Sequence, residues 1–158
     1  MTEEIDAKDV EILETLRKDS RTSMGSIGIS LGKDKATISR RIARMEEDKV
    51  IMNHSLEIDP SKLNIMKSLL YLQVVGSPVS LVIDILKKFE GVRHIYKAFG
   101  DHNLICELYT KSVDDLYELI QMQVLNIPSI QNVQVDVIVE RMVIDENADL
   151  KLYKERRK

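Results

Sequence analysis

Apolar residues recur three to four positions apart in the first fifty residues, and this spacing predicts helices rather than strands. The first predicted helix covers residues 7–18, and its apolar positions are Val10, Leu13 and Leu16. Asp6 stands where an N-cap is expected, and Asp9 follows three positions later as its acidic partner. This helix therefore has both a start signal and a face to bury.

A second, shorter helix is predicted between Ser23, as its N-cap, and Gly32, which ends it. Its apolar positions are Met24, Ile27 and Leu31. Gly25 and Gly28 lie inside it, and a glycine within a helix costs about 1 kcal/mol relative to alanine. We therefore expect this helix to depend on tertiary packing.

The stretch "KDKATISRRIARMEEDKVI", residues 33–51, predicts a third helix that is capped by Asp34. Ile38, Ile42 and Met45 share one face of this helix, and small, hydroxyl-bearing and basic side chains occupy the opposite face. A tight turn followed by a helix with small polar residues at its start and arginines beyond is typical of a helix-turn-helix. We expect base contacts from Lys35, Ala36, Thr37 and Arg40, and phosphate contacts from Lys33, Ser39, Arg41 and Arg44.

The charge distribution favours this interpretation, although the whole chain has a formal net charge of −3. Residues 17–44 contain eight Lys or Arg and two Asp, so the segment has a net charge of +6. A local basic surface is what binding to double-stranded DNA requires, because affinity for a polyanion comes from nearby charge and released counterions. The alternative is a solvated basic helix face without a DNA partner.

From residue 50 onward the apolar pattern changes to alternating strands and helices. Residues 51–59 read as an extended connector that ends before Pro60. Strands are predicted at 68–75, 92–99, 103–109 and 130–144, and helices at 79–91 and 112–128. The order β-α-β-β-α-β is that of a ferredoxin-like domain. The predicted fold class is therefore α+β, with an N-terminal helix-turn-helix domain joined to a C-terminal ferredoxin-like βαββαβ effector and dimerisation domain.

The predicted domain boundaries follow from these patterns. They are 1–50 for the helix-turn-helix domain, 51–59 for the connector, 60–144 for the effector and dimerisation domain, and 145–158 for a charged tail. The tail "LKLYKERRK" has a net charge of +4. We expect a solvated, frayed end, with contact to DNA phosphates as the alternative.

Two helices on one face of a four-stranded sheet leave the other face uncovered. The predicted strands carry Leu, Ile, Tyr and Val on both sides, so we expect this face to be too apolar for water. Pairing with a second copy would cover it, which predicts a homodimer whose two helix-turn-helix domains read a palindromic site. The packed face of the helix at 79–91 is expected to consist of Leu81, Ile85, Leu86 and Phe89.

Several other classes are excluded by composition. No apolar run approaches the roughly 18 residues that a membrane span requires, and the acidic start "MTEEIDAKDV" is unlike a signal peptide. The single cysteine, Cys106, excludes an internal disulfide and fits a cytoplasmic location. The cysteine and the three histidines are scattered along the sequence without the spacing of metal ligands. We therefore expect no metal and no cofactor.

Four segments, in this order and spacing, carry a family resemblance: "IDAKDVEILETLRKDSRTS", "ATISRRIARMEEDKVI", "IDPSKLN" and "AFGDHNLICEL". On these segments the chain resembles the Lrp/AsnC family, often called feast/famine regulatory proteins, over roughly residues 5–144. The resemblance implies a sequence-specific DNA-binding transcriptional regulator of bacterial or archaeal type, not an enzyme. It also implies dimers that assemble further into tetramers or octamers.

The resemblance further implies an amino-acid effector, bound where the effector domains of neighbouring dimers meet. Carried over by position, the effector residues would be Gly100, Asp101, His102 and Asn103. Exposed amides of such a turn can hold a carboxylate, and Asp101 can meet an ammonium group; the alternative is a plain hairpin turn, which Gly-Asp favours. Val133 and Val135 stand where amino-acid-responsive members often carry hydroxyl groups, which removes two expected partners of the head group.

Two rival functions stay open at this point. Sirohaem decarboxylases share the two-domain layout, and Arg93, His94, His102 and Arg141 could serve such a tetrapyrrole-processing enzyme. The basic residues gather in the recognition helix instead, which favours the regulator. The second rival is an amino-acid sensor that does not bind DNA, and five positive charges on a capped amphipathic helix argue against it.

Overall fold

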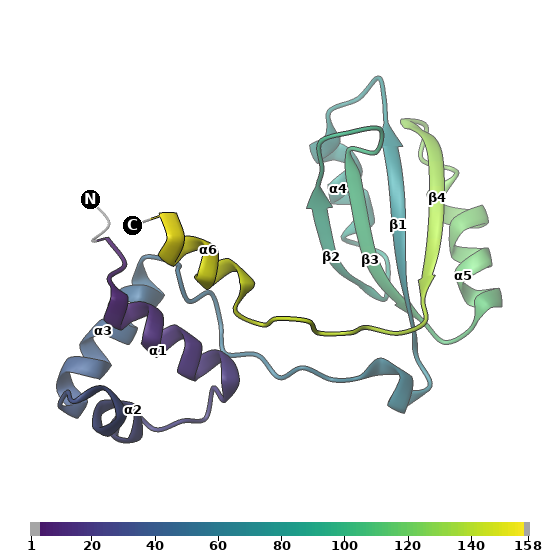
Figure 1. Ribbon diagram of the computed structural model, residues 1–158. Helices are drawn as coiled ribbons and strands as arrows, with labels where there is room; N and C mark the ends of the chain where they lie inside the picture. Colours follow the sequence, from purple (N-terminus) through teal and green to yellow (C-terminus); the bar gives the residue numbers. More distant parts are fainter. Residues whose placement is uncertain (1–3, 157–158) are drawn as a thin grey trace. The chain divides into compact units, whose positions relative to one another are not determined.

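The computed structural model describes residues 4–156, and the chain divides into two compact units (Figure 1). The helical unit holds residues 4–57 and 142–156, and the sheet unit holds residues 58–141. Each unit has its own cluster of buried apolar side chains. The C-terminal residues up to 156 thus belong to the same unit as the N-terminal ones and do not form the separate tail that the sequence predicts.

Three helices open the helical unit, and each begins after the N-cap that the sequence predicts. They are α1 (Ala7–Lys18), α2 (Met24–Leu31) and α3 (Lys35–Glu47). The side chains of Asp6, Ser23 and Asp34 each accept a hydrogen bond from the backbone amide three positions further on. These bonds satisfy amides that have no partner inside the helix, which fixes where each helix starts.

The core of the helical unit draws on all three helices. Its buried members are Ile12, Leu16, Ile27, Ile38, Ile42 and Met45. The three apolar positions predicted for α3 are all buried. In α1, Ile12 is fully buried, whereas Leu13, which the sequence predicts to pack, is only partly buried. The packed face of α1 is therefore rotated slightly from the predicted stripe.

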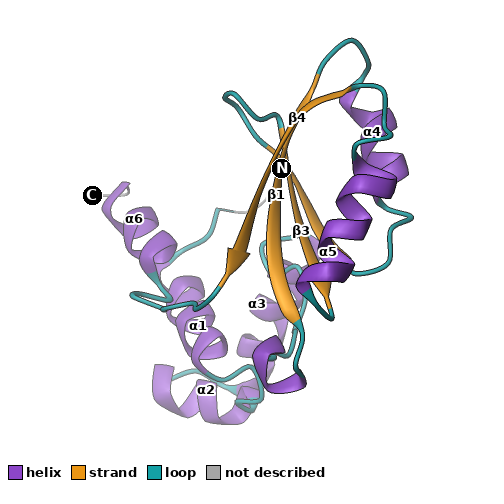
Figure 2. Cartoon of the chain, turned by 90° about the vertical axis from the view of Figure 1, so that its right-hand side faces the viewer, coloured by secondary structure: helices purple, strands orange, loops and turns teal. Residues whose placement is uncertain are grey.

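The charged C-terminal segment forms a helix, α6 (Ala148–Arg156), which lies against α1 (Figures 1 and 2). Arg17 donates hydrogen bonds to both carboxylate oxygens of Asp149, at 2.5 and 3.0 Å, and this carboxylate raises the pKa of Arg17. The Tyr153 hydroxyl donates to the Ile5 carbonyl at 3.0 Å, and Leu150 is 9% exposed. The expectation of a solvated, frayed end is therefore wrong for this helix, because Leu150 and Tyr153 pack although most of its side chains are charged.

The sheet unit has the predicted β-α-β-β-α-β order. Its elements are η1 (Pro60–Leu63), β1 (Met66–Val74), α4 (Val79–Leu86), β2 (Val92–Lys97), β3 (Leu104–Thr110), α5 (Val113–Leu119), η2 (Ile120–Val124) and β4 (Ile130–Ile138). The strands form one antiparallel sheet in the order β2-β3-β1-β4. Figure 2 shows α4 and α5 on one face of this sheet, which confirms the ferredoxin-like arrangement.

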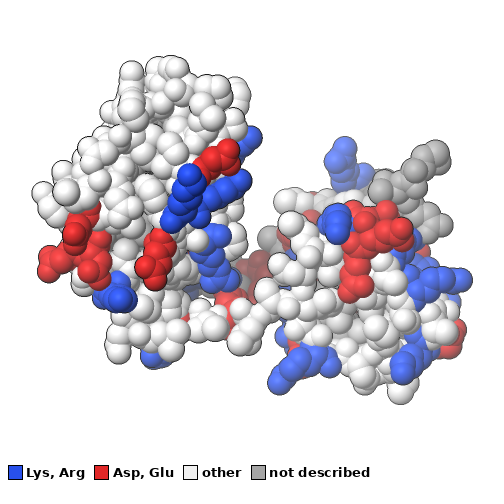
Figure 3. Space-filling view, turned by 180° about the vertical axis from the view of Figure 1, so that it is seen from behind, with Lys and Arg blue, Asp and Glu red and all other residues white. Residues whose placement is uncertain are grey.

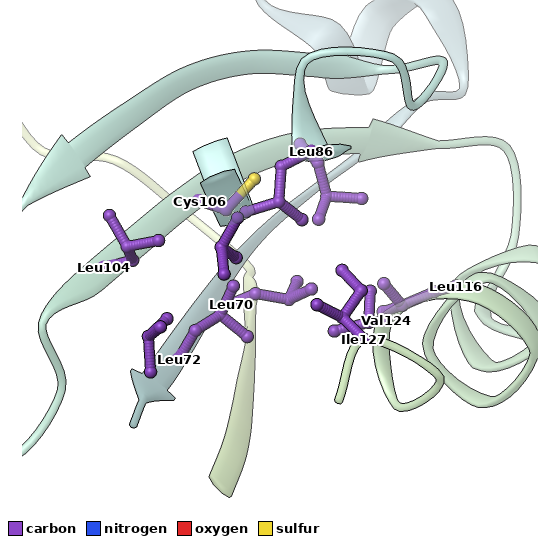
Figure 4. Close-up of a cluster of buried hydrophobic side chains, with 11 residues drawn as sticks. Leu70, Leu72, Leu86, Leu104, Cys106, Leu116, Val124 and Ile127 are labelled. Carbon is purple, nitrogen blue, oxygen red and sulfur yellow. The ribbon is translucent and has the colours of Figure 1, made fainter. Parts of the chain in front are cut away.

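The core of the sheet unit lies between the sheet and these two helices. Side chains of β1 and β3, among them Leu70 and Cys106, point towards Leu86 of α4 and Leu116 of α5 (Figure 4). Burial raises the pKa of the Cys106 thiol to about 11, with a further contribution from the charge of Glu107, so the thiol stays protonated at neutral pH. None of the described helices is long and apolar enough to cross a membrane.

The packed face of α4 differs from the predicted one. Val82 and Leu86 are buried, while Leu81 is 56% exposed and Ile85 is also exposed. The residues that face the core follow the i, i+3, i+4, i+7 spacing that starts at Val79. The helix is apolar on most sides, so its sequence alone does not single out the face that packs.

The face of the sheet that the helices leave uncovered is polar at its centre. Glu107 is only 7% exposed, and because its neighbours Cys106 and Leu108 point into the core, its side chain points away from the helices. Its carboxylate lies 3.1 Å from Lys67 Nζ and accepts a hydrogen bond from the Tyr109 hydroxyl at 3.1 Å. Burial raises the pKa of Glu107, but these two partners outweigh burial and the net shift is downward. The uncovered face is therefore less apolar than the sequence predicts, because an ion pair occupies its centre.

Candidate nucleic-acid interface and effector turn

The predicted base-contacting residues lie in the first half of α3. Lys35, Ala36 and Arg40 are exposed, and Thr37 is half-buried. Asp34 accepts hydrogen bonds from the Thr37 amide and the Thr37 hydroxyl, both at 2.8 Å. These bonds lower the pKa of Asp34, so the cap is ionised at neutral pH and holds the first turn of α3 in place.

Two of the predicted phosphate-contacting residues flank this surface. Lys33 is exposed in the turn before α3, and Ser39 is half-buried on the helix. Three exposed cationic side chains therefore lie within eight positions: those of Lys33, Lys35 and Arg40. All three side chains are accessible, and their contact with DNA stays a prediction.

The other two predicted phosphate contacts, Arg41 and Arg44, point into an ion-pair cluster with α1. Arg41 Nη1 lies 2.8 Å from a carboxylate oxygen of Asp6 and 2.8 Å from one of Asp9. Arg44 Nη2 contacts the other oxygen of Asp9, whose side chain is fully buried. Both arginine side chains are about three-quarters buried. The structure thus brings these guanidinium groups to α1 and not to the exposed face of α3.

This cluster is stabilised by charge and by hydrogen bonds at once. Asp9 also completes the capping box of α1, because it accepts from the Asp6 amide at 3.0 Å while Asp6 accepts from the Asp9 amide at 2.8 Å. Burial raises the pKa of Asp6. The hydrogen bonds from the Asp9 amide and from Arg41 lower it by more, so the net shift is downward. The hydrogen bonds that Arg41 donates to Asp9 and Asp6 raise the pKa of Arg41. In the sequence the cluster appears as two acids three positions apart at the start of α1 and two arginines three positions apart on α3, but this spacing alone does not show that they meet.

The turn between α2 and α3 depends on Gly28. The Lys33 amide donates to the Gly28 carbonyl at 2.9 Å, and a Cβ atom at position 28 would lie 2.5 Å from the Lys33 carbonyl oxygen. That approach is too close for any side chain, so Gly28 is what allows the turn to close against α2. From the sequence alone, Gly28 is expected only to lower the stability of α2.

The predicted effector residues form the turn between β2 and β3. Asn103 is engaged with the sheet, because its side-chain amide donates to the Val74 carbonyl and accepts from the Val74 amide, both at 2.8 Å. His102 meets the edge of the Tyr71 ring at 5.8 Å between centroids, and its Nε2 is buried without a hydrogen-bond partner among the described residues. Gly100 and Asp101 are exposed. The turn thus combines a structural amide with exposed groups.

Two of the four residues set aside for a tetrapyrrole enzyme, Arg93 and His94, meet around Glu107, and the other two come from the β2–β3 turn and from the segment after β4. Arg93 Nη1 bonds the Tyr109 hydroxyl at 3.2 Å, and His94 Nδ1 lies 3.5 Å from Glu107 on the uncovered face of the sheet. His102 lies in the β2–β3 turn, and Arg141 follows β4.

Val133 and Val135 of β4 pack against the core. In the part of the chain that the structure describes, no group of three His, Cys, Asp or Glu side chains is arranged to hold a metal ion.

Comparison with known proteins identifies both units. Residues 5–52 match the family of winged helix-turn-helix DNA-binding domains, and residues 72–148 match the Lrp/AsnC ligand binding domain. The HTH-type transcriptional regulator LrpA of Pyrococcus abyssi is 30% identical over 141 residues, which cover 87% of this chain and 99% of that protein.

Two solved structures share the fold. E. coli AsnC aligns with a TM-score of 0.79 at 18% identity, over 90% of this chain and 97% of that one. A transcriptional regulator of Neisseria meningitidis, solved as a complex with L-Met, aligns with a TM-score of 0.78 at 12% identity, over 93% of this chain and 99% of that one. At these identities the likeness concerns the fold.

Proposed function

Because the chain belongs to the Lrp/AsnC family of transcriptional regulators, we propose that it binds specific sites on double-stranded DNA through the exposed first half of α3. The observation that carries this proposal is the segregation of charge on α3. Lys33, Lys35 and Arg40 are exposed, while Arg41 and Arg44 pair with α1. A helix held from behind by two ion-paired arginines can present its other face to the major groove.

The side chains of this surface suit distinct roles. Lys35, Ala36, Thr37 and Arg40 are proposed to contact base edges, since small residues allow close approach and arginine can pair with guanine. Lys33 and Ser39 are proposed to contact phosphates, which set register without reading sequence. Arg41 and Arg44, predicted from the sequence to contact phosphates, are better assigned to positioning α3, because their guanidinium groups already contact carboxylates.

A homodimer forms part of the proposal. Exposed apolar residues occur along both extended segments that join the two units, with Met52 and Leu56 on one and Val139 and Ile144 on the other. Val139 is 95% exposed. Large apolar side chains exposed on each of these segments favour contact with a partner, and a second copy arranged about a twofold axis would cover them. Such a dimer would read two half-sites, and further assembly to tetramers or octamers is compatible with it.

An effector is proposed to act through the sheet unit, which matches a ligand binding domain. For an amino acid, the Gly100–Asn103 turn is the position that the resemblance suggests, with Asp101 facing the ammonium group. The test is DNA binding by gel shift in the presence of each of the twenty amino acids in turn. A shift in affinity with one of them, lost in Asp101→Ala, supports this turn as the effector site. An amino-acid effect that survives Asp101→Ala argues against it.

Arg40→Ala is expected to weaken binding to the preferred site by about 1–3 kcal/mol, because one base-contacting guanidinium is lost. The measurement is a binding isotherm at fixed salt, with the preferred site and a scrambled duplex compared. Lys88→Ala, which removes an exposed cation from the sheet unit, is the control and should leave both affinities unchanged. Equal affinity of Arg40→Ala and the parent for the preferred site would show that α3 is turned differently on DNA.

Lys33→Ala is expected to weaken binding to all sequences alike, because Lys33 is proposed to touch a phosphate. The slope of log K against log salt should decrease in magnitude by about one, the value for a single lost phosphate contact. Affinities measured at four or more salt concentrations give this slope. A loss of affinity confined to the preferred sequence would indicate that Lys33 contacts a base and not a phosphate.

A further inference from the structure

A cavity of about 480 Å³ lies in the sheet unit, where β3 ends and α5 begins, beside the turn that leads into β2. Its volume falls within the range of roughly 300–1,000 Å³ that is usual for small-molecule sites. The Gly100–Asn103 turn precedes β3, whereas the cavity is lined by residues at the other end of that strand. The cavity is therefore separate from the effector turn described above.

The charged side chains that line this cavity are mostly acidic. Glu90 contributes from the turn before β2, and Asp115 and Glu118 contribute from α5. Among the described residues that line it, Lys111 is the one with a positive charge. Acidic side chains gather over α5 at the lower left of the space-filling view (Figure 3). Three carboxylates against one ammonium favour a cationic ligand over a neutral or anionic one.

A buried hydroxyl group also lines the cavity. Thr110, the last residue of β3, is 8% exposed, and its Oγ1 has no hydrogen-bond partner among the described residues. The strand alternation places its side chain on the same side as that of Leu108, towards α5. A buried hydroxyl without a partner is costly, so a ligand that donates a hydrogen bond to Thr110 would satisfy it.

The backbone around the cavity is irregular at two places. Directly after α5 the chain forms a π-helical turn, η2, and this turn supplies Met122 and Gln123 to the lining. π-Helical turns are rare and occur frequently at functional sites. On the other wall, Gly91 has φ +85°, and a Cβ atom there would lie 2.2 Å from the Tyr109 carbonyl oxygen. The wall can thus be built only with glycine at this position.

From these observations we propose that the cavity binds a small organic ammonium ligand with an aliphatic chain. The ammonium group would lie among Glu90, Asp115 and Glu118 and donate a hydrogen bond to Thr110 Oγ1. The aliphatic chain would lie along Leu119 and Met122, which supply the apolar part of the lining. An amino acid fits less well, because its own carboxylate would face three others. Binding of this ligand does not depend on the proposed function; its role as an effector of DNA binding does.

The test is isothermal titration of the full-length protein with pentylamine and with norleucine at matched ionic strength. The two probes differ only in the α-carboxylate of norleucine, so the comparison isolates the effect of that charge. We expect one pentylamine per chain and binding of norleucine that is at least about tenfold weaker. Equal binding of the two probes, or no saturable binding of pentylamine, would overturn the proposal.

Three variants locate the bound probe. Glu118→Gln removes a lining carboxylate and should weaken pentylamine binding about tenfold, and Thr110→Val, which keeps the side-chain shape, should weaken it several-fold. Asp114→Asn is the matched control, because Asp114 is an exposed acid in the first turn of the same helix and does not line the cavity. It should bind pentylamine like the parent. Equal weakening by Asp114→Asn and Glu118→Gln would indicate a diffuse counterion effect and contradict the site.

The failure of this inference and that of the proposed function give different results. If the protein binds its DNA site but takes up no pentylamine, the cavity proposal fails and the α3 proposal stands. If pentylamine binds but no DNA site is found, the reverse holds. If both bind, pentylamine should change the DNA affinity of the parent and leave that of Glu118→Gln unchanged; no change in the parent overturns the effector role.

Discussion

Asp9→Ala is expected to destabilise the helical unit by about 3–5 kcal/mol, the cost of removing one partner from a buried ion pair. Asp9 is fully buried and contacts both Arg41 and Arg44, so its loss leaves two largely buried guanidinium groups with fewer carboxylate partners. It also removes the acceptor that completes the capping box of α1. Chemical denaturation, followed by circular dichroism, measures the change in the free energy of unfolding.

Glu11→Ala is the matched control for this prediction. Glu11 also lies on α1 and pairs with a basic residue, Lys8 at 3.3 Å, but both side chains are about 40% exposed. Exposed pairs of this kind contribute roughly 0–1 kcal/mol. Similar losses in the two variants would mean that the Asp9 cluster is no more than a surface ion pair. Arg41 and Arg44 would then be available to DNA after all.

Ending the chain after Ile144 is expected to lower the stability of the helical unit by about 3 kcal/mol, because it removes α6. The loss combines the burial of Leu150, worth about 1.5–3 kcal/mol, with the hydrogen bond from Tyr153 to Ile5, worth about 1 kcal/mol. The exposed pair of Arg17 with Asp149 should add little. The measurement is again the free energy of unfolding in denaturant.

Two point substitutions on α6 separate packing from the presence of the tail. Leu150→Ala should account for most of the loss, since Leu150 is the buried apolar residue of α6. Leu152→Ala changes the same residue type where the side chain is 66% exposed, and it should cost less than about 0.5 kcal/mol. If truncation causes no loss of stability, α6 does not pack on α1, and the tail is solvated as its net charge predicts.

The sequence identifies the elements well wherever local signals agree. The N-caps Asp6, Ser23 and Asp34 each precede an apolar stripe, so both the start and the buried face of α3 follow from spacing alone. In the sheet unit the alternation of strands and helices is enough to give the ferredoxin-like order. Helix α4 marks where this logic ends, because it is apolar nearly all round and only the position of the sheet decides which side packs.

The site is less predictable because charge says little about the direction in which a side chain points. All five basic residues of the α3 segment look alike in sequence, yet Arg41 and Arg44 meet the carboxylates of α1. Likewise, Gly28 looks like a weakness in a helix until the approach of the Lys33 carbonyl is known. Both depend on residues brought together by the fold, which no local pattern reports.

Selection of bound sequences from random double-stranded DNA tests whether the exposed first half of α3 reads specific DNA sites. We expect an enriched palindromic motif with half-sites about one or two helical turns apart. We also expect that Arg40→Ala loses the enrichment while it retains weak, salt-dependent binding to any duplex. If the parent enriches no motif, sequence reading by α3 is contradicted, and absorption titration with haem or sirohaem becomes the next experiment.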